Sequence, residues 1–153
     1  MGIKEVAVNR RARHDYEILE TYEAGLVLQG TEIKSLRNGK VQLKEAYVSF
    51  YGGEAYVKGM NISQYSYGTY NNHEEGRDRK LLLHKREIEK LYSKVKLQGN
   101  TVIPLRIYFK DNKAKMEIAL AKGKTLYDKR ESDKVRTMKR EAEKAMRRYE
   151  PVN

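Results

Sequence analysis

The chain has 153 residues, which is enough for one hydrophobic core and too few for two comfortable ones. It carries 32 Lys and Arg against 21 Asp and Glu, a formal net charge of +11. Both residues 1–121 (+6) and residues 122–153 (+5) are basic. This charge favours a polyanionic partner, either nucleic acid or an anionic membrane.

The chain contains no cysteine, which excludes disulfides, thiol catalysis and cysteine-based metal sites. No apolar run approaches the roughly 20 residues of a membrane-spanning helix. The first residues lack the long apolar core of a signal peptide. We therefore expect a cytoplasmic protein that has no membrane partner.

The first elements predicted along the chain are a strand and a short helix. Residues 16–28 are rich in β-branched and aromatic types, and we expect one long strand with a bulge or bend at Gly25. Residues 31–39 predict a short helix with Thr31 as its N-cap and Gly39 at its end.

A β-hairpin follows. Apolar and polar residues alternate over residues 46–58, and Gly52-Gly53 predicts a two-residue turn between the two strands. One face of this hairpin is apolar and the other is rich in tyrosine. Residues 63–79 are polar and predict a long loop.

The last elements of the body are a helix and a second hairpin. Residues 85–97 have helical apolar spacing, with Tyr92 expected on the buried face. Residues 103–110 and 113–120 alternate, with a turn at Asp111-Asn112, and predict a second hairpin with a basic outer face. The sum is about six strands and two or three helices. This mainly β (α+β) pattern suits a small antiparallel barrel or sandwich.

The sequence carries no motif of an enzyme. Its three histidines, His14, His73 and His84, are scattered, and no metal-binding histidine spacing or phosphate-binding glycine loop is present. We expect no catalytic residues, no metal and no cofactor. The enzyme alternative is a metal-dependent nuclease. Such an enzyme would need several carboxylates at a basic surface, and no specific motif supports one.

Three groups of residues suit RNA. The first is the basic run of residues 9–14, because arginine pairs with phosphate and stacks on bases. The second is the set of 12 tyrosines, some of which must belong to the core. The third lies just before the leucines of residues 81–83, of which at least two are expected to pack inside. From the first and third groups, the candidate contacts are Arg11, Arg13, Arg79 and Lys80.

Residues 124–153 differ in composition from the rest of the chain. They contain no glycine, a single proline and many Lys and Arg, with apolar residues at helical spacing. Their apolar content is too low to hold an isolated helix. We expect a tail that is disordered in solution and helical when bound to phosphate-rich RNA.

Five ordered motifs resemble the tmRNA-binding proteins of bacterial trans-translation, also called SsrA-binding proteins or small protein B. They cover nearly the whole chain. The motifs are NRRARHDY (9–16), YEAGL (22–26), GTEIKSLR (30–37), RKLLLHKRE (79–87) and AKGKTLYDKR (121–130).

The resemblance implies an oligonucleotide-binding-like β-barrel over residues 1–123 and a basic tail over residues 124–153. It implies an RNA-binding adaptor without catalysis, which binds the tRNA-like domain of tmRNA and delivers it to stalled ribosomes. Elongation factor Tu with GTP takes part indirectly, through alanyl-tmRNA. The tail enters the decoding centre and the empty mRNA channel. A monomer is expected.

Individual residues match family positions. Asn9, Glu23 and Leu82 match positions tied to tmRNA binding, with Lys34 and Arg37 as further phosphate contacts. The ribosome-facing start of the tail matches Gly123, Lys124, Tyr127, Asp128, Lys129 and Arg130. The chain departs from the family at Thr125, often a lysine there, and over residues 132–136. The alternative function is a general RNA chaperone or ribosome-associated RNA-binding protein.

Overall fold

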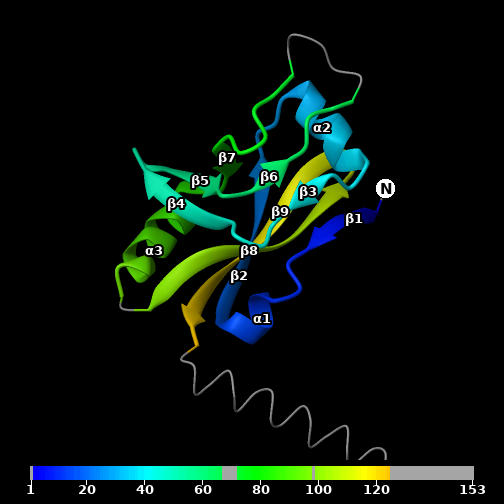
Figure 1. Ribbon diagram of the computed structural model, residues 1–153. Helices are drawn as coiled ribbons and strands as arrows, with labels where there is room; N and C mark the ends of the chain where they lie inside the picture. Colours follow the sequence, from blue (N-terminus) through cyan, green and yellow to red (C-terminus); the bar gives the residue numbers. More distant parts are fainter. Residues whose placement is uncertain (1, 67–71, 98, 125–153) are drawn as a thin grey trace, which may run out of the picture. The chain divides into compact units, whose positions relative to one another are not determined.

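The computed structural model describes residues 2–66, 72–97 and 99–124. Residues Met1–Gly123 form one compact unit, which is described here by itself (Figure 1). Its strands are β1 (Ile3–Val8), β2 (Tyr16–Leu26), β3 (Val41–Gln42), β4 (Tyr47–Tyr51), β5 (Glu54–Lys58), β6 (Asn61–Ile62), β7 (Arg79–Leu82), β8 (Asn100–Lys110) and β9 (Lys113–Gly123). Its helices are α1 (Ala12–Asp15), α2 (Gly30–Arg37) and α3 (Lys85–Val95). The protein is therefore mainly β with helices, as predicted.

Seven strands form one antiparallel sheet in the order β1-β8-β9-β2-β7-β5-β4, and β3 pairs with β6 separately. Strand pairing does not close this sheet into a barrel. Within the described part of the chain, β1 and β4 each have one pairing partner and are the edges of the sheet. β4 nevertheless lies close to β8, so the sheet curls over its own core.

The longest ladders join β8, β9 and β2. Asp111 and Asn112 both have positive φ (50° and 63°), as a tight two-residue turn between β8 and β9 requires. The sequence predicts a bulge or bend at Gly25 in β2, and the bulge is wrong, because the register is continuous there. The register shift opposite β9 lies between Ile18 and Glu20, whereas Gly25 is where β2 pairs with both β9 and β7.

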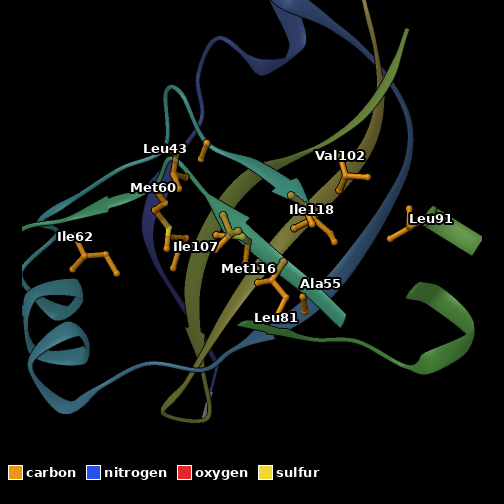
Figure 2. Packing of buried hydrophobic residues seen from close by; sticks show 14 of the residues in the cluster. Leu43, Ala55, Met60, Ile62, Leu81, Leu91, Val102, Ile107, Met116 and Ile118 are labelled. Atoms are coloured by element: carbon orange, nitrogen blue, oxygen red, sulfur yellow. The ribbon is translucent and has the colours of Figure 1, made fainter. Parts of the chain in front are cut away.

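The main core lies on the inner side of the curled sheet. Figure 2 shows buried side chains from several strands and α3 converging there, including Leu81, Leu91, Ile107 and Met116. A smaller cluster lies on the other side of the sheet, where Ala12 of α1 packs with residues of β8 and β9. The sheet thus has the main core on one face and a smaller buried cluster beneath α1 on the other.

The two longer helices begin with capping boxes. In α2 the N-cap is Gln29 and not Thr31, because the Gln29 N–H donates to the Glu32 carboxylate at 2.8 Å. Thr31 instead places its hydroxyl 2.9 Å from Nδ1 of the buried His73. α3 buries Ile88 and Leu91 as expected.

Several elements differ from the sequence-based expectation. β1, α1, β7 and the short β3–β6 pair carry too little periodicity to be predicted. Tyr92 was expected in the core, but 46 % of it is exposed. The predicted loop of residues 63–79 ends where β7 begins, and residues 67–71 lie outside the described residues. None of the described helices combines the length and apolar character needed to span a membrane.

Candidate RNA interface

Side-chain alternation gives the sheet a polar outward face. Pairing places Glu23 of β2 opposite Glu117 of β9, and Gly25 opposite both Lys115 of β9 and Leu82 of β7. Neighbouring residues in these strands, such as Met116 and Ile118, point into the core. Glu23, Lys115 and Leu82 therefore lie on the same side of the sheet, away from the core.

Glu23 is held in place by hydrogen bonding. The hydroxyl of Tyr108 in β8 donates to its carboxylate, and the Lys110 ammonium lies 3.6 Å away. The Tyr108 hydrogen bond, with the charges of Lys110 and Lys115, holds the pKa of Glu23 below its ordinary value. Burial and the same hydrogen bond raise the pKa of Tyr108. The face thus presents a fixed, ionised acceptor between two lysines.

Tyr108 is itself fixed by its surroundings. Its ring is covered by the Arg106 guanidinium, which lies 4.6 Å from the ring centroid. Arg106 also pairs with Glu117 at 3.3 Å and with Glu5 of β1 at 3.5 Å. The residues beneath Glu23 therefore form a connected network across β1, β8 and β9.

Leu82 is an exposed leucine on this face. Its side chain is 55 % exposed, whereas Leu81 before it is fully buried and Leu83 after it is half-buried. A Cβ built on Gly25 would lie 3.3 Å from the Leu82 Cβ, so the missing side chain lets Leu82 lie across β2. As expected, packing accounts for two of the three leucines, and Leu82 is left for a partner.

Asn9 lies just after β1. Its side-chain amide donates to the Pro104 carbonyl at 3.1 Å, and its backbone N–H donates to the Leu105 carbonyl at 2.7 Å. These bonds hold the basic segment that follows against β8, at the point where the register of β8 shifts.

The predicted basic residues separate into two groups at opposite ends of β2 (Figure 1). Arg11 and Arg13 lie at α1, before β2. Gly123 is at the same end, because it pairs with Tyr16, and Lys124 follows it. The Arg11 side chain is exposed and lies 3.9 Å from Asp15. Gly123, the last residue of this compact unit, therefore lies at the same end of β2 as the arginines of α1.

The second group lies on α2, after β2. The Lys34 ammonium is 5.3 Å from the centroid of the Tyr65 ring, and the Arg37 guanidinium is 5.2 Å from that of Phe109. Both residues are exposed. Lys80 lies elsewhere, on β7, with its ammonium 3.6 Å from the Glu54 carboxylate.

Arg79 does not belong to the surface. It is fully buried and donates to Glu32, to the Met60 carbonyl at 2.7 Å and to three carbonyls of residues 74–77. The prediction that Arg79 contacts RNA is wrong for this structure, because its donors are all directed at the protein interior. Its basic charge stabilises the connection between α2 and β7.

The predicted ribosome-facing residues can be placed only in part, because Tyr127, Asp128, Lys129 and Arg130 lie outside the described residues.

Residues 2–66, 72–97 and 99–124 hold no group of three or more His, Asp or Glu side chains arranged to bind a metal ion.

Comparison with known proteins identifies the family. The profile described as "SmpB protein" matches residues 6–148. The chain belongs to the SmpB protein family. The outward face that carries Glu23 and Leu82 is therefore part of the fold of an SmpB family member.

Close relatives support the same assignment. An SsrA-binding protein from Clavibacter michiganensis subsp. michiganensis is 56 % identical over 145 residues, covering 95 % of this chain and 92 % of the relative. The SsrA-binding protein of Geobacillus thermodenitrificans is 52 % identical, with coverage of 97 % and 96 %. A solved chain described by "tmRNA-SmpB: a journey to the center of the bacterial ribosome" has a TM-score of 0.67 and 51 % identity, covering 80 % of this chain and 86 % of its own.

The sequence analysis missed the residues that support Glu23. Arg106, Tyr108 and Lys110 alternate along one strand, so they were expected on one outer face. The pattern did not show that Tyr108 reaches Glu23, because β9 lies between their strands. Only the pairing order of the SmpB sheet supplies this information.

Proposed function

We propose that this protein is an RNA-binding adaptor that binds the tRNA-like domain of tmRNA and delivers it to stalled ribosomes for trans-translation. The names of its SsrA-binding relatives and the similarity to a chain from a tmRNA–SmpB study support this proposal. The observation that carries it is the outward face, where an ionised Glu23, fixed by Tyr108, lies near the exposed Leu82.

The chemistry of this face suits folded RNA with unstacked bases. A carboxylate cannot contact phosphate favourably, but it accepts hydrogen bonds from a ribose 2′-hydroxyl or a base edge. Lys110 and Lys115 flank Glu23 and suit the neighbouring phosphates. Leu82 would pack against a splayed base. A face of this kind would recognise RNA shape, and a polycation alone would not.

The basic residues at the two ends of β2 would extend this contact. Asn9, Arg11 and Arg13 would bind at one end of β2, and Lys34 and Arg37 at the other. Lys80 would bind beside Leu82. Phosphate contacts of this kind set affinity and orientation without reading sequence.

The remaining expectations are part of the same proposal. The curled sheet, with β4 close to β8, would correspond to an oligonucleotide-binding-like barrel. Residues 1–123 would be the RNA-binding body and residues 124–153 a tail that becomes helical at the decoding centre. Gly123, Lys124 and residues 127–130 would make its first ribosomal contacts. The protein would act in the cytoplasm as a monomer, with elongation factor Tu and GTP acting through alanyl-tmRNA and no catalysis of its own.

The decisive test is a titration of the tRNA-like domain of tmRNA against the full chain, with an ordinary tRNA as competitor, across a salt series. We expect selective binding at physiological salt and a loss of about 10-fold or more in Glu23→Ala, since a hydrogen bond to a charged group contributes about 1.5–3 kcal/mol. Glu17→Ala, an exposed glutamate in the same strand, is the matched control. Equal binding of both RNAs with a steep salt dependence would favour the general RNA chaperone.

A truncation tests the division into body and tail. A chain that ends at Lys122 should retain its affinity for the tRNA-like domain, because every described residue of the Glu23–Leu82 face precedes the cut. Peptide tagging on stalled ribosomes should be lost. A truncated protein that folds but no longer binds the tRNA-like domain would contradict the two-part proposal.

A further inference from the structure

A cleft of about 290 Å³ lies between the tip of the β4–β5 hairpin and α3. Phe50 and Tyr51 line it from the hairpin, and Lys85, Glu89 and Tyr92 line it from the helix. Gly52 and Gly53 form the turn with positive φ, and a Cβ on either would meet no atom within 4 Å. The turn therefore leaves the mouth of the cleft open.

The walls of this cleft are aromatic and half-exposed. Tyr51 and Tyr92 are 47 % and 46 % exposed. The Phe50 and Tyr92 rings meet edge to face, with centroids 6.5 Å apart, and Tyr51 stacks on Tyr56 at 4.1 Å. Tyr92 is held on one side by Phe50, and the Lys96 ammonium lies 4.3 Å from its ring centroid. Fixed, partly exposed rings of this kind suit stacking on a nucleobase.

The charge around the cleft also suits a nucleotide. α3 carries Lys85, Arg86, Lys90 and Lys94 against two glutamates. Lys90 and Lys94 pair with Glu20 of β2, whereas Lys85 and Arg86 make no ion pair within residues 2–66, 72–97 and 99–124. Of these two cations, Lys85 lines the cleft beside Glu89, and its ammonium can reach the phosphate of a base held against Tyr92.

The α3 wall of the cleft, which carries Tyr92, and the Glu23–Leu82 face lie on opposite sides of the sheet, whereas Tyr51, like Tyr47, lies on the outward side of β4. Leu91 of α3 packs into the main core, and Phe50 packs against that core from β4. Glu23, Lys115 and Leu82 point away from it. An RNA loop bound at Glu23 would have to pass around the sheet to reach Tyr92, so a second RNA is the simpler occupant.

We propose that this cleft binds an unpaired nucleotide of ribosomal RNA, with its base against Tyr92 and its phosphate near Lys85. This proposal rests on the proposed function, which brings the protein to the ribosome. It assigns a role to Tyr92, which the tmRNA-binding face does not use.

The test measures the affinity of the full chain for purified bacterial 70S ribosomes without tmRNA and, separately, for the tRNA-like domain. Tyr92→Leu should lower the affinity for ribosomes about 10-fold, the range expected for loss of one base–aromatic stack. It should leave binding to the tRNA-like domain unchanged. Tyr92→Phe, which keeps the ring, should retain ribosome binding. The matched control is Tyr47→Leu, because Tyr47 of β4 is as exposed as Tyr92 but lies on the outward face and does not line the cleft.

Ultraviolet cross-linking of wild-type protein to the same ribosomes identifies the occupant. The expected product is a peptide containing Tyr92 joined to a ribosomal RNA nucleotide. A cross-link to a ribosomal protein, equal ribosome binding by Tyr92→Leu and wild type, or an equal loss of tRNA-like-domain binding would each overturn the proposal. Failure of the wild type to select the tRNA-like domain would instead overturn the proposed function, and the ribosome measurements would still decide the cleft.

Discussion

Glu23 and Glu32 are both held by hydrogen bonds, but they lie in opposite environments. Glu23 is on the outward face, with 40 % of its side chain exposed, and its partners are Tyr108 and Lys110. Glu32 is fully buried in α2, and its partners are Arg77, Arg79 and its own N-cap backbone. The same residue type therefore serves a partner molecule in one place and the fold in the other.

The pKa of both carboxylates is lowered, by different balances. Burial raises the pKa of Glu32, but hydrogen bonds from Arg77, the Gln29 backbone and Arg79 outweigh it. For Glu23 the leading cause is the Tyr108 hydrogen bond, which outweighs the opposing effect of burial. A lowered pKa alone does not distinguish a structural carboxylate from a binding one. The exposed fraction of the carboxylate side chain and the number of its protein partners distinguish the two roles.

The largest expected difference is in stability. Glu32→Ala leaves the buried Arg79 without its counter-ion, which should lower the free energy of unfolding by about 3–5 kcal/mol. Glu23→Ala removes a half-exposed group and should cost no more than about 1 kcal/mol. Urea unfolding followed by circular dichroism measures both. Equal losses of unfolding free energy in the two variants would contradict the distinction between a structural carboxylate and a binding one.

A smaller effect is expected at Tyr108. Tyr108→Phe keeps the ring beneath Arg106 but removes the hydroxyl that fixes Glu23. The affinity for the tRNA-like domain should fall about fivefold, since one hydrogen bond contributes about 1 kcal/mol. The loss should be absent when Glu23 is already alanine, and this double-mutant cycle separates positioning from packing. Additive losses would show that Tyr108 acts independently of Glu23.

Local patterns in the sequence predicted most of the sheet. The hairpins at Gly52-Gly53 and Asp111-Asn112 have strong turn signals and alternation, and both are present. β1 and β7 were missed, because their residues gain strand geometry only by pairing with distant strands. Tyr92 fits the apolar spacing of α3, but the helix buries a narrower stripe than the pattern suggests.

The candidate site could be predicted only in part, because its arrangement depends on pairing between strands that are far apart in the sequence. Resemblance to a family pointed to Glu23 and Leu82, and the structure brings both to the outward face. Arg79 illustrates the opposite case. A basic residue next to other basic residues suggests RNA, but strand alternation turns Arg79 inward, where Glu32 neutralises it. Its neighbour Lys80 faces outward, so a shift of one position along the strand decides whether a basic side chain is buried or can reach RNA.

The smallest effect concerns pH and tests the Glu23 environment directly. Because the folded-state pKa of Glu23 lies below its ordinary value of 4.5, its contribution to stability is present above that pH and is lost as pH falls through the folded-state pKa. The carboxyl-carbon resonance of Glu23 should therefore titrate with a midpoint below 4.5. In Tyr108→Phe the midpoint should move upward, because the leading cause of the shift is removed. A midpoint that stays unchanged would assign the shift to the lysines, and Tyr108 would then not be what holds Glu23 ready for RNA.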